Sequence, residues 1–105
     1  LNTLPYEYYA KSHIPNSFNL PYKQIKKMSQ NELFSWFKDV ISINYPKINK
    51  LIKSKKLELY EVPIIVYCAH NKCTTSEISA IELLKKGFVN LMDFKGGMKE
   101  YLKSK

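Results

Sequence analysis

The sequence predicts an α/β domain with a parallel sheet, on three observations from its last third. Residues 63–67, Pro-Ile-Ile-Val-Tyr, are rich in β-branched side chains without polar alternation, which is typical of a strand buried on both faces. A polar loop then leads to a helix predicted over residues 75–86, which Gly87 follows as a left-handed stop. Residues 88–94 form a second strand candidate. This order of elements indicates a right-handed parallel crossover.

Two short extended pieces and a helical turn are predicted in the first twenty residues. Residues 1–4 alternate like a strand and begin without a preceding turn, so we expect some N-terminal sequence of the domain to be missing. Pro5 opens a helical turn predicted over residues 6–11. The second extended piece is residues 18–20.

Three more helices are predicted from capping residues and apolar spacing. Ser29 and Glu32 have the spacing of a capping box, ahead of a broad apolar face that runs to Ile41. Another helix is predicted after Pro46 and fades into a lysine run. The last is predicted over residues 98–102.

Length and charge limit the possible classes of function. The 105 residues fit one domain, residues 1–105. The net charge is +8, yet all 17 basic residues are Lys. Nucleic-acid surfaces usually include Arg for bidentate contacts, so we expect a solvated lysine-rich surface and no nucleic-acid partner. The longest apolar run, residues 62–69, is far shorter than the roughly 20 residues of a membrane helix, so we expect no membrane partner.

Cys68 follows the first predicted strand directly and precedes a helix start. Thr74 and Glu77 have the spacing of a capping box at that start. The first-turn N–H groups of a helix lack partners and the macrodipole adds about half a positive charge there, so a thiolate beside them is stabilised. Lys72 acts in the same direction. A stabilised thiolate suits attack on an anionic or sulfur-bearing substrate, including transfer of sulfane sulfur through a cysteine persulfide.

Three separate stretches resemble the rhodanese family. Residues 13–21, His-Ile-Pro-Asn-Ser-Phe-Asn-Leu-Pro, are similar to its first signature, commonly H-I-P-G-A-x-N-x-P, with Asn16 in place of Gly. Residues 65–68, Ile-Val-Tyr-Cys, resemble its active-site strand. Residues 87–101 resemble its closing G-[FY]-x-N-V and x-G-G-x-x-x-W stretch, with Tyr101 in place of Trp. The three occur in the family's order and cover both ends of the chain.

The resemblance implies a single-domain sulfurtransferase with a rhodanese-like fold, a parallel central sheet of about five strands flanked by helices. It implies that Cys68 is the nucleophile, with thiosulfate or another persulfide as the donor and a thiol, cyanide or a protein as the sulfur acceptor. It also implies that the loop after Cys68 cradles the sulfur with its backbone N–H groups. The predicted substrate-binding residues are Ala69, His70, Asn71, Lys72 and Thr74. No cofactor is implied.

Cys73 departs from the commonest loop of the family and gives the C-x4-C form that a subset of rhodanese-like sequences has. We interpret it as a resolving thiol. Two alternatives stay open, that it is the true nucleophile or that it is a small residue filling the helix start. A disulfide with Cys68 requires Cα atoms within about 7 Å. The alternative function is a non-catalytic rhodanese module that senses oxidants through both thiols or binds a partner protein.

Two other chemistries are disfavoured by the residue types. With two His and no C-x-x-C pair, we expect no metal site. His13 is interpreted as a turn residue bonded to the backbone, and His70 as a loop or substrate contact. Cysteine phosphatases of the same fold use C-x5-R, but the sixth residue after Cys68 is Thr74 and the chain has no Arg to grip a phosphoryl group.

The sulfurtransferase hypothesis requires that solvent can reach the Cys68 thiol. Gly96 and Gly97 are interpreted as permitting a tight turn near the cysteine loop, because glycine adopts backbone angles that other residues rarely adopt. Two cysteines fit either a reducing or an oxidising compartment. We expect a cytoplasmic protein, with a periplasmic or secreted location after processing as the alternative.

Overall fold

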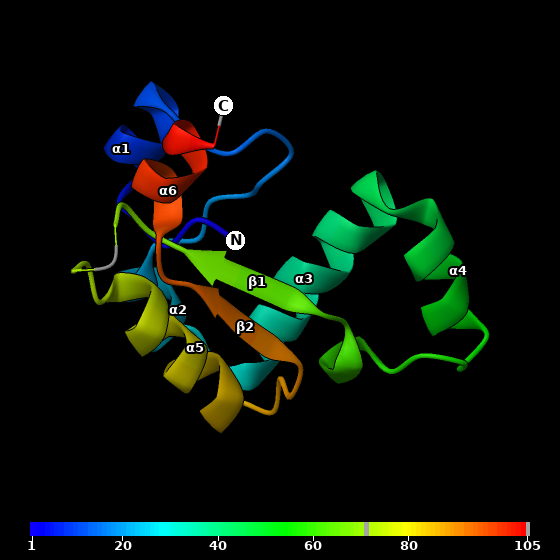
Figure 1. The fold of residues 1–105 in the computed structure, drawn as a ribbon. Helices are drawn as coiled ribbons and strands as arrows, with labels where there is room; N and C mark the ends of the chain where they lie inside the picture. Colours follow the sequence, from blue (N-terminus) through cyan, green and yellow to red (C-terminus); the bar gives the residue numbers. More distant parts are fainter. Residues whose placement is uncertain (71, 105) are drawn as a thin grey trace.

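The computed structural model describes residues 1–70 and 72–104 and shows a small parallel sheet with helices around it (Figure 1). In chain order the elements are α1 (Tyr6–Lys11), α2 (Tyr22–Lys27), α3 (Gln30–Asn44), α4 (Pro46–Lys53), the 3-10 turn η1 (Leu59–Glu61), β1 (Ile64–Tyr67), α5 (Thr75–Lys85), β2 (Leu91–Phe94) and α6 (Gly97–Lys103). The strand, helix, strand and final helix of the last third are those that the sequence predicts. None of the helices in the described ranges has the length and apolar character needed to cross a bilayer.

The sheet is narrower than the resemblance implies. β1 and β2 pair in parallel with Ile64 opposite Leu91. Asn2 forms parallel bridges to both Tyr67 and Asn19, so an extended segment around Asn2 lies beside β1 and a second one, around Asn19, lies beyond it. The expectation of about five strands is therefore wrong for the described residues, which form two strands and two single-residue bridges. The outer segments pair over one residue each, which is too short for a strand.

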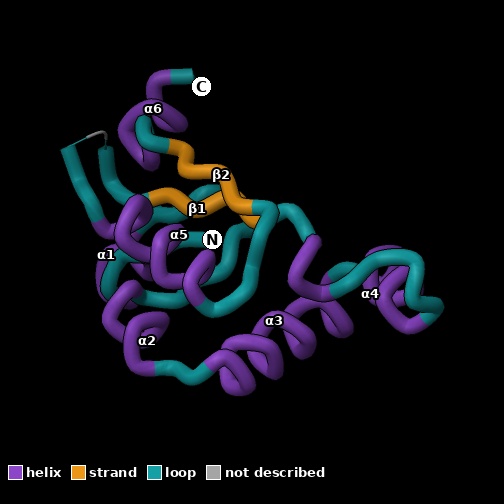
Figure 2. Tube along the Cα trace, turned by 90° about the horizontal axis from the view of Figure 1, so that it is seen from below, coloured by secondary structure: helices purple, strands orange, loops and turns teal. Residues whose placement is uncertain are grey.

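One face of the sheet is covered by helices and the other is partly open. α5 packs against both strands, and α2 lies against α5 on the side away from the sheet (Figure 2). Ile64 and Val66 are buried, whereas Ile65 is 50% exposed and its pairing partner Met92 is 57% exposed. The prediction that residues 63–67 are buried on both faces is wrong at Pro63 and Ile65, which are exposed; no helix in residues 1–70 and 72–104 covers the Ile65 side chain.

The helix ends test the predicted capping boxes. At α3, the Ser29 hydroxyl accepts from the Glu32 N–H at 3.1 Å, and the Ser29 N–H donates to the Glu32 carboxylate at 3.0 Å. This box is confirmed. At α5, Thr74 makes no side-chain capping bond, so the box predicted with Glu77 is wrong. Thr74 has helical angles, φ −100° and ψ −1°, and a capping side chain normally needs an extended backbone. Gly87 ends α5 at φ 102°, as predicted.

The core lies between α3, η1, the sheet and α5. Phe88 is its largest fully buried side chain and packs against the rings of Phe37 and Tyr60, at centroid distances of 5.0 and 4.9 Å. The buried members of the cluster are Leu20, Ile25, Leu33, Phe37, Ile41, Leu59, Val62, Ile64, Val66, Leu83 and Phe88. α4 contributes no buried residue and projects at the end of the molecule far from α1 and α6 (Figure 1). α2 and η1 are not predicted from the sequence.

The first signature segment is bound to the end of β1 through the Tyr67 hydroxyl. This oxygen accepts from the Ile14 N–H at 3.0 Å and from Asn2 Nδ2 at 3.2 Å. Its own proton then goes to Ser17 Oγ at 2.6 Å. Asn16 adopts the left-handed conformation, φ 66°, at the position where the family commonly has Gly. These contacts hold the segment against the strand that leads to the cysteines.

Candidate functional site

The two cysteines lie at the carboxyl end of β1, in the loop that leads to α5. This end of the molecule also carries α1 and α6 (Figure 1). The first turn of α6 holds the loop, because the Met98 N–H donates to the Cys68 carbonyl and the Lys99 N–H to the Ala69 carbonyl, both at 2.9 Å. Gly97 makes this approach possible. It has φ 57°, and a Cβ on it would overlap the Cys68 carbonyl. The predicted tight turn beside the cysteine loop is confirmed.

Cys68 is buried, with 1% of its surface exposed. Its Sγ lies 3.3 Å from the carbonyl oxygen of Cys73, 3.4 Å from Ser76 Oγ and 4.0 Å from the carbonyl oxygen of His70. The two carbonyl oxygens can only accept, so the Cys68 sulfur acts here as an S–H donor. The requirement that solvent reaches this thiol is not met in this conformation. The carbonyl groups of His70 and Cys73 and the Ser76 hydroxyl surround it, which a position at the end of a strand does not by itself indicate.

Cys73 is partly exposed, and its thiol has the environment expected for Cys68. Burial raises the pKa of Cys73, but hydrogen bonds outweigh it and the net pKa is lowered. The donors are the Cys68 thiol, the Thr75 hydroxyl, and the backbone N–H groups of Thr75 and Ala69. Both N–H groups and the start of α5 favour negative charge on this sulfur. The loop therefore stabilises a thiolate at Cys73.

The other predicted loop residues differ in how they are positioned relative to the two thiols. Ala69 supplies one of the N–H donors to Cys73. His70 is exposed and shapes the loop, because its Nδ1 accepts from the Lys72 N–H at 3.1 Å and its carbonyl accepts from the Cys73 N–H at 3.0 Å. Asn71 lies outside the described residues. Within the described part of the chain, the Lys72 ammonium makes no hydrogen bond to either thiol, and Thr74 is exposed.

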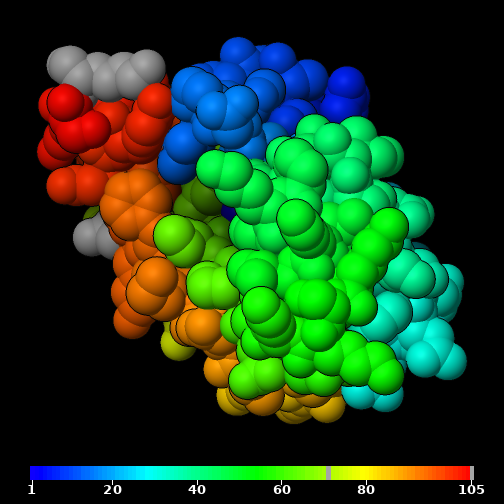
Figure 3. Space-filling view, turned by 90° about the vertical axis from the view of Figure 1, so that its right-hand side faces the viewer, coloured from blue at the N-terminus to red at the C-terminus, as the bar shows by residue number. Residues whose placement is uncertain are grey.

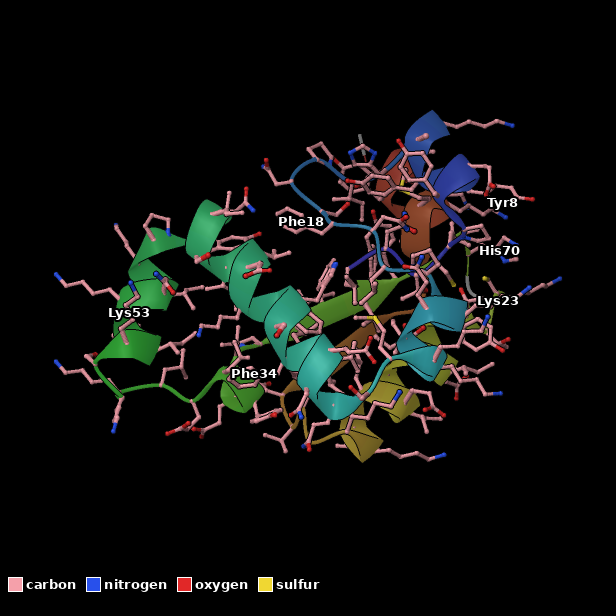
Figure 4. All side chains as sticks on the ribbon, turned by 180° about the vertical axis from the view of Figure 1, so that it is seen from behind. Tyr8, Phe18, Lys23, Phe34, Lys53 and His70 are labelled. Atoms are coloured by element: carbon pink, nitrogen blue, oxygen red, sulfur yellow. The ribbon has the colours of Figure 1, made fainter. Side chains whose placement is uncertain are left out.

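His13 lies outside the cysteine loop. Its Nδ1–H donates to the Tyr9 carbonyl at 2.9 Å, and its ring stacks on the Tyr9 ring at 3.9 Å. The interpretation of His13 as a backbone-bonded turn residue is confirmed. Figure 4 shows Tyr8, Lys23 and His70 at the end of the molecule that holds the loop, and Lys53 of α4 at the opposite end. Among residues 1–70 and 72–104, no three His, Cys, Asp or Glu side chains lie together as metal ligands.

The comparison with protein families decides the identity of this arrangement. The model of the Rhodanese-like domain matches residues 3–104. The chain belongs to the rhodanese-like family. No curated protein and no solved structure matches the chain significantly. The family match covers the signature segment, the cysteine loop and the closing Gly-Gly turn, the three stretches on which the resemblance was based.

Two polar residues of this rhodanese-like site, Thr75 and Thr3, are not predicted from the sequence. The pattern indicates Thr75 only as part of the helix start, yet its hydroxyl contacts Cys73 Sγ at 3.4 Å. The Oγ1 of Thr3, in the N-terminal segment, lies 3.2 Å from Thr75 Oγ1. A pair of hydroxyl residues has no local pattern that could have pointed to this contact. Only the parallel pairing of the first segment with β1 brings them together.

Two apolar hollows lie on the open face of the rhodanese-like domain, away from both thiols. Their volumes are about 290 and 510 Å³, and Leu1, Ser17 and Ile65 line both. Figure 3 shows this side of the molecule, with the hollowed surface between the blue N-terminal segment, the green α3 and α4 region and orange β2. Neither hollow is lined by Cys68 or Cys73, so neither is the candidate site.

Proposed function

We propose that this rhodanese-like domain is a sulfurtransferase that moves a sulfane sulfur from an anionic donor such as thiosulfate to a thiol or cyanide acceptor. The observation that supports it is the position of the Cys73 thiol, which is partly exposed at the start of α5 and lies 3.4 Å from the Thr75 hydroxyl, in a loop whose hydrogen bonds lower its pKa. A thiolate is the nucleophilic form of cysteine, and a persulfide anion has the same charge in almost the same place. Hydrogen-bond donors that stabilise the thiolate therefore also stabilise the persulfide anion.

The proposed reaction balances without an oxidant. The Cys73 thiolate attacks the outer sulfur of thiosulfate and forms a new S–S bond, while the S–S bond of the donor breaks and its electron pair leaves with sulfite. The persulfide anion stays on Cys73 among the Ala69 and Thr75 N–H groups. Cyanide or a thiolate then attacks the outer sulfur, and the electron pair of the Cys73–sulfur bond returns to Cys73 as thiolate.

The proposal assigns the carrier role to Cys73 and a supporting role to Cys68, in contrast to the role that the resemblance implies for Cys68. Cys68 is buried and its S–H group donates to its surroundings, whereas Cys73 is partly exposed with a lowered pKa. When Cys73 carries negative charge, the single Cys68 S–H proton turns from the carbonyl oxygens to the Cys73 sulfur. In the proposed cycle it stabilises the charge on Cys73.

The test is mass spectrometry after treatment with thiosulfate, combined with turnover of thiosulfate and cyanide. We expect the gain of one sulfur atom on Cys73 in the unsubstituted protein and in Cys68→Ala, with turnover reduced in Cys68→Ala but measurable. We expect neither sulfur nor turnover above background in Cys73→Ala. Ser104→Ala, in an exposed residue after α6, is the control. Sulfur on Cys68 with full turnover in Cys73→Ala would return the carrier role to Cys68.

A redox-sensing module is the second candidate function, because both free thiols belong to one short loop and Cys68 Sγ lies 3.3 Å from the carbonyl oxygen of Cys73. Oxidation would join the two sulfurs and remove both protons, with a mild oxidant such as a peroxide or a disulfide as the electron acceptor. Absence of sulfur on either thiol with every donor, together with a reversible Cys68–Cys73 disulfide, would favour this candidate over the sulfurtransferase.

A further inference from the structure

A line of hydrogen-bonding side chains runs from Cys73 into the core. Cys73 Sγ lies 3.4 Å from Thr75 Oγ1, which lies 3.2 Å from Thr3 Oγ1. Thr3 Oγ1 lies 3.2 Å from the carbonyl oxygen of Tyr67. Thr3 is 1% exposed, and its N–H also binds the Tyr67 carbonyl, at 3.1 Å. The inner end of the line is therefore fixed by the pairing of the N-terminal segment with β1.

The proton positions along the line depend on the charge of Cys73. A carbonyl oxygen only accepts, so with a neutral Cys73 each group can donate inward: Cys73 to Thr75, Thr75 to Thr3, and Thr3 to Tyr67. With a Cys73 thiolate, Thr75 donates to the sulfur and Thr3 donates to Thr75. The Tyr67 carbonyl accepts from the Thr3 N–H whether Cys73 is neutral or a thiolate. Two hydroxyl rotations therefore follow the charge, and neither state leaves a buried hydroxyl without a partner.

We propose that Thr75, oriented by Thr3, is a positioning residue that directs its O–H at Cys73 Sγ when this sulfur carries negative charge. Any effect of Thr75 on sulfur transfer rests on the proposed function, whereas its effect on the ionisation of the Cys73 thiol does not. The line ends on a carbonyl, which has no basic lone pair for a proton at neutral pH, so it orients a donor and does not carry the proton away.

The Thr75 hydroxyl has no competing structural task at the helix end. The residue at the N-cap of α5 is Thr74, and no side chain caps this helix. Thr75 is the first residue of α5, and its hydroxyl contacts are those to Thr3 and Cys73. A purely structural role would be met by any side chain of similar shape. A donor role requires the hydroxyl.

Other charged or titratable groups around the thiol are left unchanged by the test. They come from the loop after β1, from the first turn of α5, and from the α6 helix that binds the loop. These residues are Cys68, His70, Lys72, Glu77 and Lys99. The segment of residues 1–4 contributes no ionisable side chain, and its Leu1 ammonium, which donates to the Ile65 carbonyl, is also left unchanged. Any change in the titration of Cys73 on substitution of Thr75 or Thr3 is therefore assigned to the hydroxyls.

The experiment is the pH dependence of iodoacetamide alkylation at Cys73, located by peptide mass spectrometry, without any sulfur donor. Thr75→Val removes the hydroxyl and keeps the shape, and we expect it to raise the pKa of Cys73 by about one unit. Thr75→Ser keeps a hydroxyl and should titrate close to the unsubstituted protein. Thr3→Val should shift the pKa of Cys73 in the same direction by a smaller amount, and Thr3→Ser should restore it.

Two results would overturn the proposal. One is a Thr75→Val protein that titrates like the unsubstituted chain. The other is a Thr75→Ser protein shifted as far as Thr75→Val, which would make the effect one of packing. Should Thr75→Val not fold, Thr75→Ala takes its place under the same criteria. Failure of sulfur transfer leaves the titration result standing, because no donor is present in it.

Discussion

At Gly97 the backbone of α6 meets the cysteine loop without any side chain between them. The residue is in the left-handed region, and its next neighbour donates to the Cys68 carbonyl. A side chain at this position would collide with the backbone of Cys68 and would lie 3.0 Å from the carbonyl carbon of Ala69. Backbone cannot move aside as a flexible side chain does. The single missing Cβ therefore lets α6 set the position of the loop.

We predict that Gly97→Ala lowers the free energy of unfolding by about 3 kcal/mol, from a left-handed backbone penalty together with overpacking. Urea unfolding followed by circular dichroism measures the loss. Lys99→Ala, an exposed residue in the same helix, should stay within about 0.5 kcal/mol of the unsubstituted protein. Equal stability of the two variants would contradict the close approach described for this turn.

Among the elements, α3 depends on its first turn. It is the longest helix of the described chain and carries Leu33, Phe37 and Ile41 into the core. Its capping box satisfies N–H groups that have no partner in the helix. We predict that Ser29→Ala lowers the free energy of unfolding by about 1 kcal/mol, measured by urea unfolding. Ser35→Ala, exposed in the middle of the same helix, is the control and should not destabilise.

The same box makes part of the stability depend on pH. The Ser29 backbone N–H, followed by the Ser29 side chain, lowers the pKa of Glu32. A carboxyl with a lowered pKa in the folded state stabilises the fold above its unfolded pKa, and this stabilisation is lost as the pH falls through the folded value. Glu32→Gln keeps an oxygen acceptor but does not titrate. Its unfolding free energy should therefore lack this acid-side decrease, and parallel curves for the two proteins would contradict the assignment.

At the scale of the whole molecule, Phe88 joins the parts of the fold that lie far apart in the sequence. Its ring packs on α3 through Phe37 and on η1 through Tyr60, immediately before the chain enters β2. We predict that Phe88→Ala lowers the free energy of unfolding by about 3–5 kcal/mol. This is a large part of the roughly 5–15 kcal/mol that stabilises a domain. Thermal and urea unfolding measure it.

The adjacent residue provides the matched control for this prediction. Val89 is 63% exposed, so Val89→Ala removes apolar surface that is largely in water already. We expect it to change stability by no more than about 0.5 kcal/mol. A similar loss for both variants would mean that the three rings do not form the centre of the core.

Much of the local structure and the family could be predicted from the sequence, because those features are encoded by neighbours in the chain. The Ser29 capping box, the span of α5, the turn at Gly87 and the Gly96–Gly97 turn depend on spacing and on backbone freedom within a few residues. The family match over residues 3–104 agrees with the three stretches quoted from the sequence. The C-x4-C loop at the carboxyl end of a strand is visible in the same way.

The tertiary structure alone decided which thiol is exposed and what surrounds it. Cys68 is buried against the carbonyl groups of His70 and Cys73 and the hydroxyl of Ser76. The Cys73 thiol contacts the Thr75 hydroxyl, which in turn contacts Thr3 near the other end of the chain. The open face at Ile65 likewise depends on which helices reach the sheet. Hydrogen bonding and solvent access depend on the positions of atoms in space. A sequence pattern that identifies the two cysteines therefore does not determine which thiol is buried and which is exposed.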